Sequence, residues 1–107
     1  YIRVVMPNGD VYPKRYFGLR IGRFLDSFLP GQSDEGSFRE EFGLHYVNIP
    51  KKQHYAGLVL HREVIGSAHL WREKRLLQPQ VCFSDSLKVE VEKAGLRLPK
   101  YFELRDV

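Results

Sequence analysis

The sequence contains a single cysteine, Cys82, among its 107 residues. One thiol excludes an intrachain disulfide and every multi-cysteine zinc site, so a domain of this size must be stabilised by its hydrophobic core. Scarce cysteine is typical of a reducing compartment, and we expect an intracellular location, cytoplasmic or nuclear, with an organelle left open. Because Val81 and Phe83 flank Cys82, we predict that this thiol is buried and unreactive.

Long apolar runs are also missing. The longest candidates, such as residues 56–60, have the length of a strand, whereas a membrane span needs roughly 18 to 20 residues. We therefore expect no membrane segment. The first residues lack the basic segment and the apolar segment of a secretory signal peptide. Because the sequence starts at Tyr1 and not at Met, we expect a processed product or an excised domain.

The composition that is present has the balance of one globular domain, with 43% apolar and 28% charged residues. The length suits one core, so we expect a single domain over residues 1–107. The 17 basic residues outnumber the 13 acidic ones. This excess is uneven, because residues 1–29 and 44–79 are basic whereas residues 30–43 carry four acidic side chains and one basic.

The first third of the chain predicts a hairpin and two helices. Residues 2–6 and 11–17 are strand candidates around Asn8-Gly9, a pair that suits a type I′ turn with positive φ at both positions. Five apolar residues recur at helical spacing over residues 21–29. A serine and a glutamate in residues 37–40 have the spacing of a capping box, so a second short helix is expected there, with Gly43 as its C-cap.

From Leu44 onward the apolar period shifts towards two. Strands are predicted over residues 44–49, 55–65, 80–83 and 86–92, with a turn at residues 93–95. Gly66-Ser67 fits either a type II′ turn or the start of a helix reaching Leu77. We therefore predict an α+β domain, whose antiparallel or mixed sheet of about five strands opens with the hairpin and has one or two helices packed on one face.

Motifs that would indicate catalysis are not found in the sequence. The four histidines stand about eight residues apart without the HxxxH or HExxH spacing of a zinc site, and neither a GxSxG elbow nor a P-loop occurs. We expect no catalytic residue, no metal and no cofactor. The sequence favours a binding module over an enzyme.

Basic residues interleaved with aromatic ones are the remaining signal. Cations suit phosphates and neighbouring rings suit exposed bases, so we predict contact with nucleic acid, RNA or DNA. Trp71 fits either stacking on a base or packing in the core. The predicted nucleic-acid-binding residues are Lys14, Arg15, Arg20, Arg23, Lys51, Lys52, Tyr55, Arg72, Lys74 and Arg75.

A family resemblance gives an alternative. Asn8-Gly9-Asp10, followed by Arg23-Phe24 and Ser27-Phe28, resembles the opening hairpin and helix start of doublecortin domains. That resemblance implies a ubiquitin-like fold and a protein–protein interaction domain, whose partner would be an acidic protein surface such as the microtubule.

Overall fold

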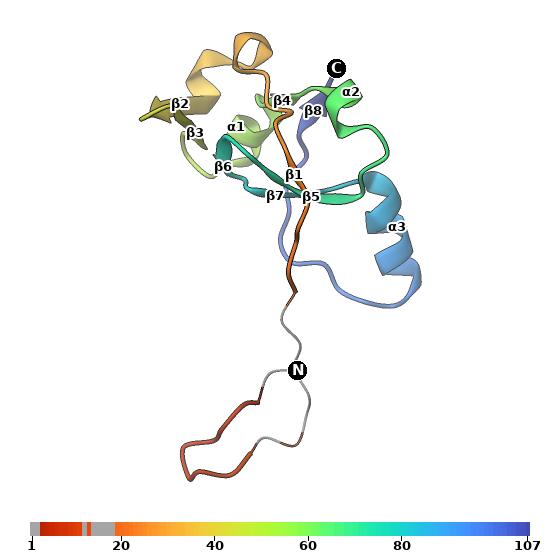
Figure 1. The fold of residues 1–107 in the computed structure, drawn as a ribbon. Helices are drawn as coiled ribbons and strands as arrows, with labels where there is room; N and C mark the ends of the chain where they lie inside the picture. Colours follow the sequence, from red (N-terminus) through yellow and green to blue (C-terminus); the bar gives the residue numbers. More distant parts are fainter. Residues whose placement is uncertain (1–2, 12, 14–18) are drawn as a thin grey trace.

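The computed structural model describes residues 3–11, 13 and 19–107 (Figure 1). Over these residues the chain adopts an α+β fold, which confirms the predicted class. The strands are β1 (Phe24–Leu25), β2 (Phe38–Glu41), β3 (Leu44–Val47), β4 (Val59–Leu60), β5 (Leu70–Glu73), β6 (Leu76–Gln78), β7 (Val81–Phe83) and β8 (Arg105–Asp106). The helices are α1 (Lys52–Ala56), α2 (Arg62–Ile65) and α3 (Asp85–Lys93), with short 3-10 turns η1 (Pro30–Gln32) and η2 (Glu35–Ser37).

The strands form three small sheets instead of the predicted single sheet of about five strands. Two sheets have three strands, in the orders β1-β5-β7 and β2-β3-β6, and the third pairs β4 with β8. Pairs β2/β3 and β5/β7 are antiparallel, whereas β1/β5, β3/β6 and β4/β8 are parallel. Each parallel pair joins segments that are distant in the sequence, so the fold depends on long-range pairing.

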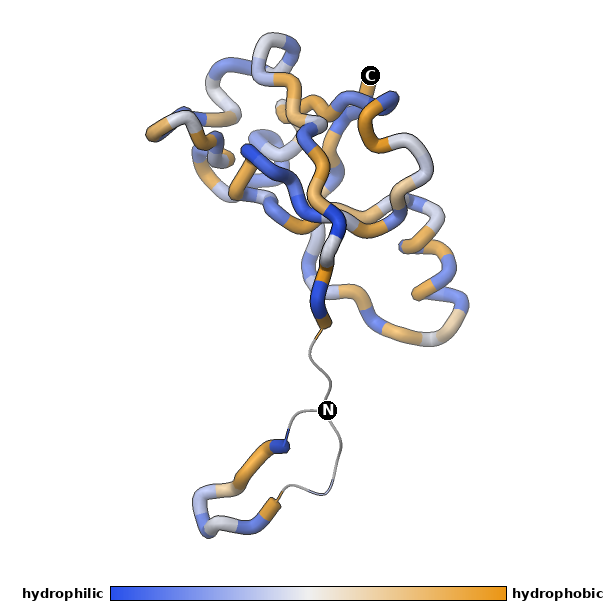
Figure 2. The backbone as a smooth tube through the Cα atoms, viewed as in Figure 1, coloured by the Kyte–Doolittle hydropathy of each residue, from blue (hydrophilic) through white to orange (hydrophobic). Residues whose placement is uncertain are grey.

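The core lies where these sheets meet. Phe28, Val47, Leu58 and Leu76 are each at most 1% exposed and pack in one cluster with buried residues of β4, β5 and β7. Figure 2 shows hydrophobic stretches from several of these segments meeting in the body of the fold. In the described part of the chain, no helix has the length and apolar character needed to cross a bilayer.

The opening hairpin is described only over its first strand and its turn. Val5 and Val11 form an antiparallel bridge, as predicted, whereas most of the returning strand at residues 11–17 lies outside the described residues. Every residue from 3 to 11 is exposed. Figure 1 draws this hairpin apart from the body, so its side chains do not contribute to the core described above.

The turn of this hairpin differs from the predicted type I′. Gly9 has a positive φ of +90°, but Asn8 does not. The reason is Pro7, whose ring fixes φ near −65° at the first central position. Gly9 N donates to Met6 O at 2.9 Å, which gives a type I turn followed by a glycine bulge.

The helix predicted over residues 21–29 is wrong. Phe24–Leu25 instead pairs in parallel with β5, and Phe28 forms a bridge to β4. Ser27 shows why, because a helix with this apolar stripe would turn Ser27 towards water, whereas the fold buries it completely. Its backbone N donates to the carboxylate of Glu73 at 3.1 Å. Tertiary pairing thus overrides the local periodicity.

The second predicted helix, at residues 37–42, is also wrong, because this segment forms β2 and the turn into β3. Glu41 pairs with Leu44, leaving a two-residue loop of Phe42 and Gly43. Both loop residues have positive φ, +53° and +76°, which is the type I′ geometry. Gly43 is therefore a turn residue and not a helix C-cap.

The strand predicted over residues 86–92 is helix α3. Ser84 caps it, its Oγ accepting from Leu87 N at 3.1 Å. The strict alternation misled the prediction because, of its three apolar residues, Leu87 and Val91, four residues apart, are half-buried, while Val89 is 45% exposed. With so few apolar residues, the same sequence fits both the alternation of a strand and one face of a helix.

The turn predicted at residues 93–95 ends this helix instead of joining two strands. Gly95, with φ +74°, donates to Glu92 O at 3.0 Å, and Leu96 N donates to Val91 O at 3.2 Å. These two bonds form a Schellman motif, which satisfies the last carbonyl groups of the helix.

The remaining expectations are confirmed in part. Strands predicted over residues 44–49 and 80–83 correspond to β3 and β7. The strand predicted over residues 55–65 is reduced to β4, because α1 precedes it and α2 follows it. Of the two alternatives for Gly66-Ser67, the type II′ turn is right: Gly66 has φ 56° and ψ −124°, and β5 follows in place of a helix.

Candidate functional site

The residues predicted to bind nucleic acid are distributed over several elements. Lys14 and Arg15 lie outside the described residues. The structure brings Arg23 and Arg72 together at the β1–β5 pair, where Arg72 N donates to Arg23 O at 2.8 Å, and Lys74 lies in the bend after β5. Lys51 and Lys52 instead begin α1, and exposed Arg20 precedes β1.

Several of these side chains contact other residues of the chain. Tyr55 is buried, and its ring stacks on Phe102 with centroids 4.2 Å apart, so it is a core residue and not a base platform. The Arg75 Nε lies 2.8 Å from the Asp26 carboxylate. The guanidinium of Arg72 lies 5.9 Å from the centre of the Phe24 ring. These contacts give the residues structural roles within the described fold.

A buried carboxylate lies at the end of β5, the central strand of the sheet formed by β1, β5 and β7. Glu73, 0% exposed, accepts three hydrogen bonds: from Ser27 N at 3.1 Å, from Ser27 Oγ, and from the indole Nε1 of Trp71 at 2.9 Å. Trp71 is itself only 3% exposed, which decides in favour of its core role. The cluster fastens the segment after β1 to β5, and being sealed from solvent it offers no binding surface.

The lone cysteine lies next to this cluster in the core. Cys82 is 6% exposed, and burial raises the pKa of its thiol to about 12, with the Glu73 carboxylate adding to the shift. The thiolate, not the thiol, is the reactive form, so the fold keeps Cys82 inert at neutral pH.

Native labelling of Cys82 by a maleimide at pH 7.5 is expected to be slow and to become rapid only after denaturation. The unfolded chain releases the thiol proton near the ordinary pKa of 9, below the folded value of about 12. The free energy of unfolding should therefore fall as pH rises from 9 towards 12. Rapid stoichiometric labelling of the folded protein would contradict this burial.

The histidines take separate roles. His45 is buried and lies 3.6 Å from Glu40, whereas His69 forms a 2.7 Å hydrogen bond with Ser84 at the start of α3. Within residues 3–11, 13 and 19–107, no group of three or more His, Cys, Asp or Glu side chains is placed to hold a metal ion.

A groove of about 1050 Å³ runs between α3, the β5–β7 pair and the segment that leads to β8. Its lining is largely apolar and includes Phe83, Leu87, Val91, Tyr101 and Leu104. Helix α3 contributes half-buried residues and no buried one, so it covers the groove only in part.

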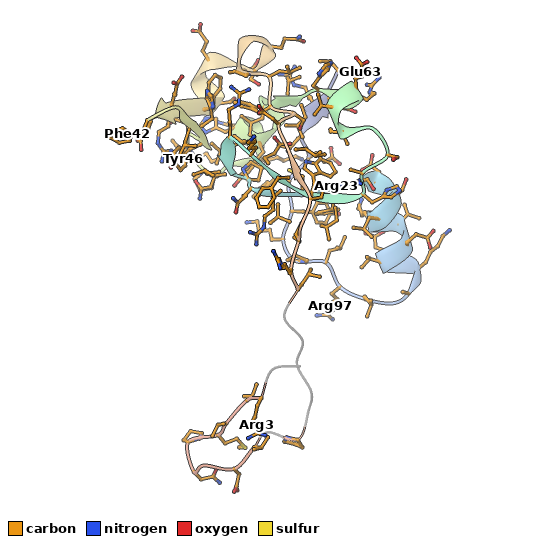
Figure 3. The ribbon with its side chains drawn as sticks, viewed as in Figure 1. Arg3, Arg23, Phe42, Tyr46, Glu63 and Arg97 are labelled. Atoms are coloured by element: carbon orange, nitrogen blue, oxygen red, sulfur yellow. The ribbon has the colours of Figure 1, made fainter. Side chains whose placement is uncertain are left out.

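The β2–β3 hairpin ends in an exposed aromatic residue. We call residues 40–43 the hairpin tip. Phe42 is 103% exposed, and Figure 3 shows its side chain at the far end of the hairpin, directed away from the body. Its left-handed backbone costs a non-glycine residue about 1 to 2 kcal/mol. Sequence reasoning did not single out Phe42, because the capping-box spacing placed it within the expected second helix.

Comparison with known proteins identifies the family of the chain. A family model described as Immunity protein family (Imm11) matches residues 2–106. No curated protein and no solved structure matches the chain. The family match overturns the predicted nucleic-acid-binding function and partner, and equally the doublecortin-like alternative with its acidic microtubule surface, because an immunity protein acts against a toxin. The match is to the family as a whole and assigns no role to individual residues, and on its evidence the chain belongs to the Immunity protein family (Imm11).

Proposed function

We propose that this chain protects a bacterial cell from a toxin by binding the toxin protein directly. The observation that carries the proposal is the family match, which extends over residues 2–106 and thus over nearly the whole sequence. Tight binding of one protein by another needs a rigid surface with exposed anchor residues. Strands β2 and β3 supply such a surface at the hairpin tip, because their pairing on both sides fixes the backbone of Phe42 and Gly43.

We further propose that the chain acts inside the cell. A single cysteine and a core without disulfides suit a reducing compartment. In that setting the chain would meet a toxin that has entered the cell or is made there.

Protection from a toxin is the expected outcome of co-expression. Candidate toxin domains from the source bacterium are expressed one at a time in a bacterial host, with and without the full chain. One toxin should stop growth alone and permit it when the chain is present, and the purified pair should co-elute in gel filtration. An unrelated toxin serves as the control for specificity. Failure to restore growth or to bind any of these toxins would overturn the proposal.

A further inference from the structure

We infer that the hairpin tip, residues 40–43, is the surface by which the chain contacts its toxin, and that Phe42 is the anchor. The inference rests on the proposed function and assigns the binding site within it. The expected counterpart on the toxin is an apolar pocket bordered by basic side chains.

Phe42 carries two unfavourable features in the free chain. Its ring is 103% exposed, although burial of an aromatic side chain is among the largest favourable terms in folding and binding. Its φ of +53° is a conformation that glycine and asparagine adopt more easily. Neither feature supports the fold that the structure describes. Strained backbone and exposed aromatic rings concentrate at functional sites, where a partner supplies the missing contacts.

The strands that carry Phe42 hold it in a fixed position. Arg39 on β2 ties the hairpin together: its Nη1 donates to Val47 O at 3.0 Å, and its Nε lies 3.2 Å from the Glu41 carboxylate. The same guanidinium lies 5.0 Å from the centre of the Tyr46 ring on β3. An anchor that is already ordered loses less conformational entropy on binding, which favours affinity.

The acidic charge around the hairpin tip indicates that the toxin surface it contacts is basic. Glu40 and Glu41 directly precede Phe42, and residues 30–43 carry four acidic side chains and one basic, in a chain whose total net charge is +4. The acidic segment is therefore a local reversal of sign. His45 lies 3.6 Å from the Glu40 carboxylate, and Arg39 positions that of Glu41. A basic toxin face would be attracted to this segment and repelled elsewhere, which sets the orientation of docking.

The Phe42 ring and the carboxylates of Glu40 and Glu41 lie together at the outer end of the hairpin formed by β2 and β3. Figure 2 shows the outer end of this hairpin as hydrophobic, and Figure 3 shows Phe42 at that end, with Tyr46 nearby on the same hairpin. A projection of this shape inserts into a concave surface and does not match a flat one. The toxin site would thus be a pocket, blocked by the tip.

The test uses the full chain and the toxin that it neutralises in co-expression. Phe42→Ala should weaken binding of the purified toxin by about 30-fold or more, the loss that defines a hot-spot residue. Phe42→Asn should lose the same affinity while keeping or raising the unfolding midpoint, because Asn-Gly is the preferred type I′ pair. The matched control is Phe24→Ala, which removes a 53% exposed phenylalanine from β1 and should leave affinity unchanged.

The charge contribution is measured separately. The double variant Glu40→Gln, Glu41→Gln should lower the association rate and reduce its dependence on salt, with little change in dissociation. Undiminished toxin affinity in both Phe42 variants, or a loss confined to Phe24→Ala, would overturn the assignment while the proposed function stands. If the wild-type chain binds no toxin, the proposed function fails first, and the assignment of the tip fails with it.

Discussion

Replacing Glu73 with Ala is expected to lower the free energy of unfolding by about 3 to 5 kcal/mol. The substitution leaves the backbone N and hydroxyl of Ser27 and the indole N–H of Trp71 without their acceptor in a site that water does not reach. It also opens a cavity between β1 and β5. Urea unfolding followed by the fluorescence of Trp71 measures the loss directly, since that indole is one of the affected donors.

Glu73→Gln is the matched control for this prediction. The amide keeps the shape and one acceptor oxygen but turns its NH2 group towards donors, so we expect a smaller loss of about 1 to 3 kcal/mol. Unfolding free energies for Glu73→Ala within about 0.5 kcal/mol of the wild type would show that the cluster does not hold the segment after β1, because surface substitutions have effects of that size.

Replacing Phe28 with Ala is expected to cost a comparable 3 to 5 kcal/mol, roughly the range for truncation of a buried phenylalanine. Phe28 is 1% exposed, and its ring contacts Phe38 of β2 and His45 of β3 edge-on, with centroids 5.3 and 5.1 Å away. Through its bridge to Leu60 it also connects β4, so it joins two of the three sheets.

The control for Phe28 is again Phe24→Ala, because both side chains come from the same segment and only one is buried. We expect Phe24→Ala to shift the unfolding midpoint far less. If the two variants were equally stable, the segment would not adopt the extended course described here, and the predicted helix over residues 21–29 would regain support.

The fold class could be predicted from the sequence, but the pairing of its elements could not. The patterns at residues 44–49 and 80–83 marked real strands because one face of each strand is buried, with His45 and Val47 in β3 and Cys82 in β7. The segment at residues 21–29 failed because five apolar residues fit a helical stripe as well as an extended strand. What decides between them is Ser27, whose burial depends on a carboxylate on β5 that no local pattern reveals.

Two serines at predicted or observed helix starts also show that local patterns do not decide the secondary structure. Ser37 and Glu40 have the spacing of a capping box, yet this segment forms a strand, whereas Ser84 does cap α3 although the apolar pattern after it alternates. Short elements have weak local preferences, and partners from distant segments decide their structure.

The candidate site was beyond sequence reasoning for a different reason. Basic and aromatic residues indicate attraction to an acidic polymer, but the same residues serve as ion-pair partners and core groups, as Arg75 and Tyr55 do here. The functional assignment came from similarity along residues 2–106, a property of the whole pattern and not of any charged cluster. Phe42 could be recognised as a candidate contact residue only from its backbone angle and its exposure, which the sequence does not reveal.

The pairing of β4 with β8 sets the order in which a growing chain can complete its fold. Leu58 and Leu60 accept backbone hydrogen bonds from Arg105 and Val107, at 3.1 and 3.0 Å, and Val107 O accepts from Arg62 N at 2.7 Å. On the ribosome, residues 58–62 emerge before residues 105–107 are translated, so their backbone groups lack these partners during that interval. A growing chain therefore cannot close the β4–β8 sheet until residues 105–107 have left the ribosome, so this part of the fold forms after the segments between the two strands have been made.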